Sequence, residues 1–195
     1  MRQPAFPTTQ SALYPDGTNL SQVLNTMKIS NRNAFKQIEE AIIEINRHYS
    51  GISFNHLANN IELLIEEEPF DHAVHISNIS DGTLRFLCLM AILYNPNRGS
   101  VVCIDEPELG LHPDMILTLF EAIKYASKTS QIIISTHSAQ LLDCFDLNQV
   151  IVFEKNKENA TVVKQGMKEE DFSAWKDDYF VGKMWRSGAI GGNRW

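Results

Sequence analysis

The sequence lacks any long hydrophobic run. The longest unbroken one has nine residues, Phe86 to Tyr94, whereas a helix that spans a membrane needs roughly 20 apolar residues. The N-terminal segment MRQPAFPTTQ has one Arg and two Pro, but no apolar block like that of a signal peptide. We therefore expect a cytoplasmic chain without a membrane-spanning segment.

Cysteine and positive charge are also scarce. Cys88, Cys103 and Cys144 are odd in number, widely spaced and set among apolar residues, so we expect buried, reduced thiols rather than disulfides or a metal site. The formal net charge of −7 gives no sequence-wide attraction to nucleic acid and leaves only a local basic patch open. The 195 residues are 44% hydrophobic, which suits one globular domain with a real core.

The first part of the chain predicts helices and a hairpin. Residues 1–30 are rich in Pro, Thr, Ser, Asn and Gly, which favours a loop that leads into a short helix near Leu20–Met27. Apolar residues at helical spacing predict a long amphipathic helix from Asn31 to Tyr49. Two short β-like runs flank Asn59-Asn60 and predict an antiparallel hairpin. A mostly buried helix then begins at a capping Ser80 and ends before Pro96.

The second part alternates between strands and helices. Nearly all-apolar strands separated by helices indicate a parallel sheet covered on both faces, which is an α/β layered fold. The segment KNKENATVVKQ predicts a turn and an edge strand, and a closing helix is expected from Glu169 to Gly188, with Trp175, Tyr179 and Trp185 packed inward. The alternating elements are strand Val101–Asp105, helix Asp114–Ser127, strand Gln131–Ser135, short helix Ala139–Cys144 and strand Gln149–Glu154.

Three carboxylates come within four residues, directly after the four apolar residues of the first of these strands: Asp105, Glu106 and Glu108. Like charges this close repel one another, and each loses solvation near the core, so the arrangement is costly unless something positive binds there. Ligands of open parallel sheets bind beyond the carboxyl ends of strands. Asp105 could therefore hold Mg²⁺ directly or through water, and Glu106 could orient and deprotonate an attacking water. The alternative is an ordinary charged strand end.

Two further polar segments stand at comparable places. His137, in ISTHS, follows another apolar strand and could donate a hydrogen bond to a terminal phosphate; the alternative is a hydrogen-bonded loop histidine. In SDGTLRF, Ser80, Asp81 and Gly82 begin a helix, where amide donors and the helix dipole favour an anion and Gly82 would let a phosphate approach the backbone. The alternative is an ordinary helix cap. Arg85, one turn after Asp81, is expected to make a local ion pair. The alternative, at an interface with a partner molecule, is a contact with phosphate or with a carboxylate of that partner.

Three segments, in this order and at this spacing, resemble one family. They are ISDGTLRFL, VVCIDEPELGLHP and IIISTHSAQLLD. They look like the ABC-type ATPase head shared by RecF-like and SMC-like proteins and, more closely, like the predicted ATPases of bacteria and archaea that are labelled AAA family. The segments YPDGTNLSQVL and GKMWRSGAIGGNRW resemble the same group. The likeness therefore runs from about Tyr14 to Trp195.

The resemblance implies a fold and a cofactor. The fold would be the C-terminal portion of a P-loop NTPase head, with a mostly parallel sheet flanked by helices and an antiparallel edge, formed by residues 31–195. ATP with Mg²⁺ would lie between two such heads. Asp81 stands where the transporter form of the signature has Gly, a departure typical of the RecF-like branch.

It also implies roles for individual residues. The nucleotide-binding signature would include Ser80, Asp81, Gly82 and Thr83; the metal ligand would be Asp105, the catalytic base Glu106, the D-loop Gly110 to Pro113, and the switch histidine His137.

The phosphate-binding loop of such ATPases is missing from these 195 residues. No Gly-x-x-x-x-Gly-Lys-Ser/Thr occurs; Gly182-Lys183 is followed by Met184 and lacks the upstream Gly. Because that loop supplies the amide donors and the Lys that hold a polyphosphate, we expect weak ATP binding by the chain alone. The expectation is a C-terminal piece of a longer ATPase, or a split or truncated product.

Three functional hypotheses follow. The first is ATP hydrolysis at a site completed by a Walker A segment, with a second head in a homodimer. The second is a non-catalytic module that presents Ser80–Thr83 to a complete partner head, with DNA or a defence system as a possible further partner. The third and weakest is a metal-dependent nuclease or phosphoesterase built on Asp105, Glu106, Glu108 and His112.

Overall fold

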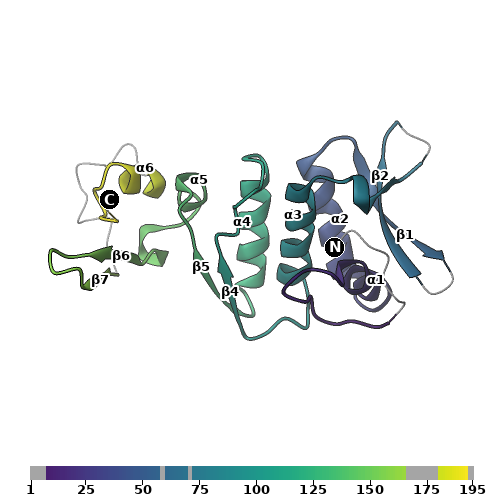
Figure 1. Cartoon of the computed structure of the whole chain (residues 1–195), viewed down its shortest axis with the longest axis horizontal. Coiled ribbons are helices and arrows are strands. Elements are labelled where there is room, and N and C mark those ends of the chain that lie inside the picture. The colour runs from purple at the N-terminus through teal and green to yellow at the C-terminus, as the bar shows by residue number, and fades with distance from the viewer. Residues whose placement is uncertain (1–7, 58–59, 70–71, 166–179, 193–195) are drawn as a thin grey trace. The chain divides into compact units, whose positions relative to one another are not determined.

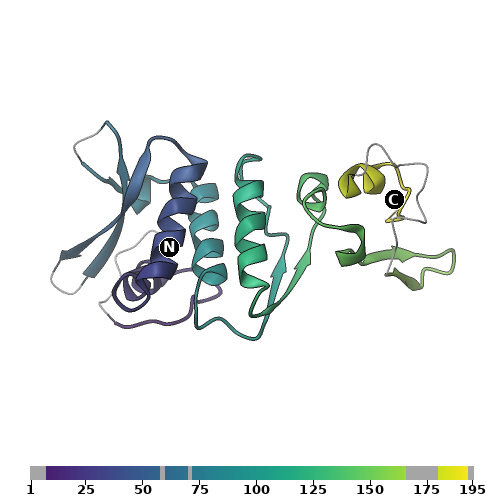
Figure 2. The same cartoon turned by 180° about the vertical axis from the view of Figure 1, so that it is seen from behind.

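The computed structural model describes residues 8–57, 60–69, 72–165 and 180–192 of the chain (Figures 1 and 2). The chain divides into two compact units, Met1–Ser135 and Thr136–Trp195. None of the helices within the described residues has the length and apolar character that crossing a bilayer requires.

The first unit begins with two helices and an antiparallel sheet. Helix α1 spans Leu20–Ser30 and α2 spans Arg32–Ile45. Strands β1, Tyr49–Leu57, and β2, Asn60–Glu67, form the predicted hairpin, and the two-residue strand β3, Val74–His75, pairs with β2. A short 3-10 helix, Ile76–Asn78, follows.

The predicted helices near these strands are confirmed, with one boundary corrected. Helix α2 buries Phe35, Ile38 and Ile42, as its apolar spacing predicts. It ends at Ile45 rather than at Tyr49, because Asn46 adopts an extended backbone and its side-chain oxygen accepts a hydrogen bond from the amide of His48 at 3.1 Å. Such a local side-chain bond competes with continuation of a helix.

Helix α3, Asp81–Leu93, runs along the core of the first unit. It lies beside α4, Met115–Ala126, on one side and beside α2 on the other (Figure 1). Most of its side chains are buried, among them Leu84, Phe86 and Leu87. A helix that is apolar around most of its circumference must be covered on several sides, so α3 fixes the positions of its neighbours.

The parallel pairing predicted from the sequence is present. Strand β4 spans Val101–Asp105, β5 spans Gln131–Ser135, and the two pair in parallel over their whole length. Helix α4 packs against β5 (Figure 2).

The prediction that helices cover both faces of this sheet is wrong for the described residues. Alternate residues of both strands are exposed, with Val101 at 51% and Ile133 at 50%. Cys103 lies on this open face as well and is exposed rather than buried. Neighbouring side chains of a strand point to opposite faces, so one apolar face of the β4–β5 pair lacks a cover that a parallel sheet normally has.

The second unit is small and has its own core. Helices α5, Ala139–Leu142, and α6, Val181–Arg186, pack together, and β6, Val152–Lys155, pairs antiparallel with β7, Thr161–Lys164. A 3-10 helix, Leu147–Gln149, takes up the start of the predicted strand Gln149–Glu154. The buried apolar cluster contains Leu142, Leu147, Val152, Val181, Met184 and Ile190.

Two expectations for this unit change. Strand β6 has its hydrogen-bonded partner in β7 rather than in the parallel sheet, so the antiparallel edge is a separate two-stranded sheet. Of the predicted closing helix, Trp185 lies in α6 and packs partly buried against the core cluster. Trp175 and Tyr179 lie outside the described residues.

Thiol labelling tests the exposure of the β4–β5 face. Burial raises the pKa of the Cys88 thiol to about 11, so at pH 8 only about one thiol in a thousand is the reactive thiolate. We expect iodoacetamide to modify the exposed Cys103 at least about 100-fold faster than Cys88. Peptide mass spectrometry separates the two, and a Cys103→Ser variant is the control. Equal labelling rates would contradict the exposure described for β4.

A glycine substitution tests the packing of α6 on α5. A Cβ atom on Gly182 would lie 1.9 Å from the backbone oxygen of Ala139, so we expect Gly182→Ala to destabilise the second unit by roughly 2 kcal/mol. This loss would occur although Ala is favoured over Gly in helices by about 1 kcal/mol. All three tryptophans of the chain lie after residue 136, so urea unfolding followed by their fluorescence reports on this unit.

The exposed neighbour supplies the matched control for that measurement. Lys183→Ala should change stability by less than about 0.5 kcal/mol, because Lys183 is exposed on the same helix. A stabilising effect of Gly182→Ala would refute the close contact.

Candidate functional site

The acidic residues stand at the carboxyl end of β4, where the sequence places them. Asp105 is the last residue of the strand, is exposed, and lies opposite Ser135 of β5 in the parallel register. The Ser135 hydroxyl donates a hydrogen bond to Oδ1 of Asp105. This bond orients the carboxylate at the edge where ligands of parallel sheets bind.

Glu106 begins the loop after β4 and has an unusual backbone. Its φ is 42°, in the left-handed region that non-glycine residues rarely adopt. Its amide donates to the backbone oxygen of Ser135 at 3.0 Å, which extends the contact between the strands by one residue. Its own carbonyl oxygen accepts hydrogen bonds from the amide of Leu109 at 3.1 Å and from Nη2 of Arg85 at 2.9 Å. The position of Glu106 is therefore fixed from three directions.

Arg85, for which a local ion pair is predicted, makes a different contact that the structure describes. Nη2 of Arg85 donates a hydrogen bond to the backbone carbonyl of Glu106. The sequence does not predict this bond, because the two residues are 21 positions apart and the acceptor is a backbone oxygen, which every residue has.

The first turn of α3 is a helix cap of the expected kind. Oγ of Ser80 accepts a hydrogen bond from the amide of Thr83 at 3.1 Å and shares a second with the Thr83 hydroxyl at 2.9 Å. Asp81 is exposed in this turn, where a negative charge is favoured by the helix dipole. The same charge would repel a phosphate, so anion binding here depends on a counterion or on the partner molecule.

Gly82 packs closely against the backbone of Gly110. A Cβ atom at this position would lie 2.6 Å from the backbone oxygen of Gly110, so only glycine allows the two backbones to approach. Gly110 itself has a φ of 76°, which glycine adopts at little cost. The first turn of α3 and the loop after β4 are thus in direct contact within the first unit.

His137 is described within the second unit. It is exposed, and its ring centroid lies 6.5 Å from that of Trp185. Ser138 caps α5 by accepting a hydrogen bond from the amide of Leu141 at 3.2 Å. Asp143 accepts a hydrogen bond from the amide of Gly182 at 2.7 Å and ties α6 to α5. This aspartate was not singled out from the sequence, where nothing sets it apart from other surface carboxylates.

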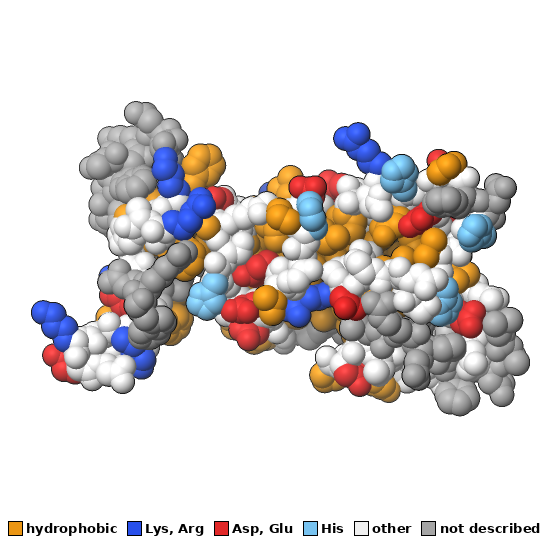
Figure 3. All heavy atoms as spheres, turned by 45° about the horizontal axis from the view of Figure 1, so that its top comes forward, with side chains coloured by type: hydrophobic (Ala, Val, Ile, Leu, Met, Phe, Trp, Pro, Cys, Tyr) orange, Lys and Arg blue, Asp and Glu red, His pale blue; other side chains and the backbone are white. Residues whose placement is uncertain are grey.

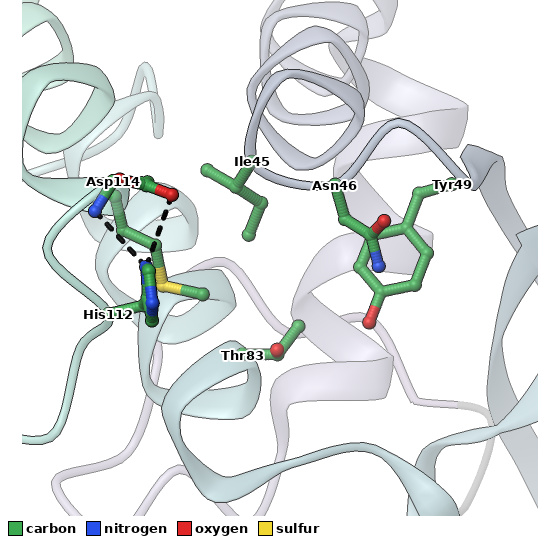
Figure 4. Close-up of a pocket in the computed structure, with 7 residues that line it drawn as sticks. Ile45, Asn46, Tyr49, Thr83, His112 and Asp114 are labelled. Carbon is green, nitrogen blue, oxygen red and sulfur yellow. Dashed lines mark hydrogen bonds and ion pairs between the residues drawn. The ribbon is translucent and has the colours of Figure 1, made fainter.

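A pocket of about 320 Å³ adjoins the first turn of α3 (Figure 4). His112 and Asp114 lie on one side of it, with Nδ1 of His112 3.4 Å from Oδ2 of Asp114, and Asn46 and Tyr49 lie on the other. Thr83 forms part of the wall between them. No pattern in the sequence indicates this pocket, because its walls come from three separate segments of the first unit.

In the view of Figure 3, several acidic side chains lie together, with exposed hydrophobic side chains beside them. Within the described ranges, no three His, Cys, Asp or Glu side chains are placed to hold a metal ion together. Asp105 fits a different kind of site, because Mg²⁺ in nucleotide enzymes is held by one or two carboxylates together with phosphate oxygens and water.

Comparison with sequences of known proteins assigns the chain to a family with an AAA domain. Residues 3–143 match the family described as "AAA domain, putative AbiEii toxin, Type IV TA system". The chain is 27% identical over 141 residues to the Old nuclease of Escherichia phage P2, a match that covers 66% of this chain and 24% of that protein. It is 32% identical over 69 residues to the uncharacterized protein MJECL43 of Methanocaldococcus jannaschii, covering 35% and 18% of the two chains. The chain thus spans a quarter or less of these curated relatives.

Comparison of structures gives the fold. An SMC ATPase structure, concerned with ATP-driven dimerization and DNA-stimulated activation, matches with a TM-score of 0.56 and 14% identity over 79% of this chain and 96% of that one. The Smc head of Pyrococcus furiosus with an extended coiled coil, bound to the C-terminal domain of ScpA, has the same TM-score and identity, over 79% of this chain and 39% of that one. The predicted α/β fold of an ATPase head is confirmed, and the chain belongs to the AAA-domain family that its residues 3–143 match.

Proposed function

We propose that this chain supplies the signature turn, the Walker B carboxylates and the switch histidine of an ABC-type ATP site, in which ATP is sandwiched between two heads. The observation that carries the proposal is the end of the β4–β5 pair. There Asp105 is oriented by Ser135, Glu106 is fixed by the adjoining strand, and the first turn of α3 rests on the same loop through Gly82. Family membership and the fold of SMC heads agree with this role.

Each residue would have a distinct task. Asp105 would hold Mg²⁺, which neutralises phosphate charge when it is bound. Glu106 would accept the proton of the attacking water, and His137 would donate a hydrogen bond to the terminal phosphate. Ser80 to Thr83 would contact the nucleotide held by the opposing head.

The phosphate-binding loop would come from a segment outside these 195 residues. The exposed apolar face of the β4–β5 pair, with Val101, Cys103 and Ile133, is consistent with a covering layer of that kind, because parallel sheets are normally buried on both faces. In the Smc head of Pyrococcus furiosus, this chain matches 39% of the polypeptide. A head completed in this way would associate with its partner when ATP binds and separate after hydrolysis.

A second function, a non-catalytic module, is favoured by one observation. The sequence contains no Walker A motif, so the chain alone would lack the amide donors that hold the phosphates. It would then present Ser80–Thr83 to a complete partner head and hydrolyse nothing itself.

The nuclease hypothesis receives less support. The name of the phage P2 relative includes nuclease, but the match covers only 24% of that protein. The described part of this chain has no three-ligand cluster of acidic, histidine or cysteine side chains. A role beside DNA or in a defence system would belong to the larger protein or to partners.

Substitution of the proposed base tests the ATPase directly. In the longer protein, or in this chain supplemented with a phosphate-binding segment, Glu106→Gln should lower the rate of ATP turnover by about 100-fold or more. Binding of Mg-ATP should persist, since the amide is nearly isosteric with the carboxylate. Glu108→Gln is the matched control from the same loop and should lower turnover by less than about threefold. Wild-type turnover in Glu106→Gln, or a larger loss in Glu108→Gln, would refute the assignment.

Equilibrium binding tests whether ATP binding needs a segment from outside these 195 residues. We expect the chain alone to bind Mg-ATP with a dissociation constant above about 1 mM, which corresponds to less than about 4 kcal/mol of binding free energy. Isothermal calorimetry measures it. Micromolar binding would contradict the need for a segment from outside.

A further inference from the structure

Glu106 adopts a backbone conformation that something must hold. A left-handed φ costs a non-glycine residue about 1–2 kcal/mol, and such residues persist only where their surroundings over-determine them. The amide of Glu106 is held by Ser135 of the neighbouring strand at 3.0 Å. Its carbonyl group is held by the guanidinium of Arg85 at 2.9 Å and by the amide of Leu109.

Arg85 brings helix α3 into contact with this loop. It lies one turn after the Ser80 cap. Gly82, in the first turn of the same helix, rests against the carbonyl oxygen of Gly110. Helix α3 therefore contacts the loop after β4 at two places, Glu106 and Gly110. A shift of the first turn of α3 would change both contacts.

The bonding of Arg85 differs from that of an arginine with a purely structural task. In the same unit, Arg98 donates from Nε to Ser130, from Nη1 to the carbonyl of Asn95 and from Nη2 to the carbonyl of Ala126, at 2.9–3.1 Å. By contrast, Nε of Arg85 is buried without a hydrogen-bond acceptor in the part of the chain that the structure describes. A buried donor without an acceptor costs free energy, so stability alone does not explain this arrangement.

We propose that Arg85 is a positioning residue that couples the signature turn of α3 to the backbone of Glu106. A partner or nucleotide that binds Ser80 to Thr83 shifts the first turn of α3, and the hydrogen bond from Arg85 then shifts the backbone of Glu106, the proposed base. Binding at the half-site formed by the signature turn thus changes the position of the base in the other half-site. The second half of this inference rests on the proposed function, whereas the link between Arg85 and the Glu106 loop does not.

The link is tested without nucleotide, by hydrogen exchange of the Leu109 amide in the chain as it is. That amide bonds the same carbonyl oxygen as Arg85. In Arg85→Ala, its exchange should quicken about tenfold, the factor that matches loss of one hydrogen bond from a charged donor. Arg85→Lys keeps a donor and should stay within about threefold of wild type. Unchanged exchange of Leu109 in folded Arg85→Ala protein would overturn the proposal.

Arg98→Ala is the matched control. It removes an arginine that also binds backbone carbonyls, but at Asn95 and Ala126. We expect faster exchange near Ser130 and no change at Leu109. If Arg98→Ala quickens Leu109 as much as Arg85→Ala does, the effect is a general loss of stability and the specific link is refuted.

Turnover by the completed ATPase tests the coupling. Arg85→Ala should lower kcat by about tenfold, while the dissociation constant for Mg-ATP changes by less than about twofold and Arg85→Lys recovers part of the rate. An equal loss of binding and kcat would indicate a structural role and overturn the coupling. If Glu106→Gln leaves turnover unchanged, the proposed function fails instead, and the exchange result for Leu109 still decides the link itself.

Discussion

The parallel pairing of β4 with β5 is the constraint on which the candidate site depends. It places Asp105 opposite Ser135, whose hydroxyl orients the carboxylate, and it leaves the backbone oxygen of Ser135 to receive the amide of Glu106. That hydrogen bond holds the backbone at Glu106, the residue with the left-handed φ. A slip of one residue in the register would turn the side chains of one strand to the opposite face of the sheet. It would also shift the loop after β4 away from the first turn of α3.

The same strand pair explains the unusual surface of the first unit. Helix α4 packs on one side of it, while Val101 and Ile133 are half exposed on the other. At the end of β4, the negative charges of Asp105, Glu106 and Glu108 repel one another unless a cation binds there. An exposed apolar face beside the carboxylates that end β4 is consistent with a site completed by a further protein segment.

Local sequence patterns predicted the helices and strands well, but they did not predict contacts between residues far apart in the chain. The bounds of β4, β5 and the cap at Ser80 follow from apolar runs and a capping residue, and the structure has them as expected. The cover of the sheet, the exposure of Cys103 and the bond from Arg85 to Glu106 depend on segments far apart in the chain, so the sequence pattern could not give them. The role of His137 stays a prediction.

Paramagnetic broadening by Mn-ATP tests the metal-bound nucleotide at the end of β4 most directly. In the longer protein that carries a phosphate-binding loop, the account requires the amide signals of Asp105, Glu106 and Ser135 to broaden strongly, while that of Leu63 on β2 stays sharp. Asp105→Asn should weaken the broadening. Saturating Mn-ATP that leaves all three signals sharp would contradict the account.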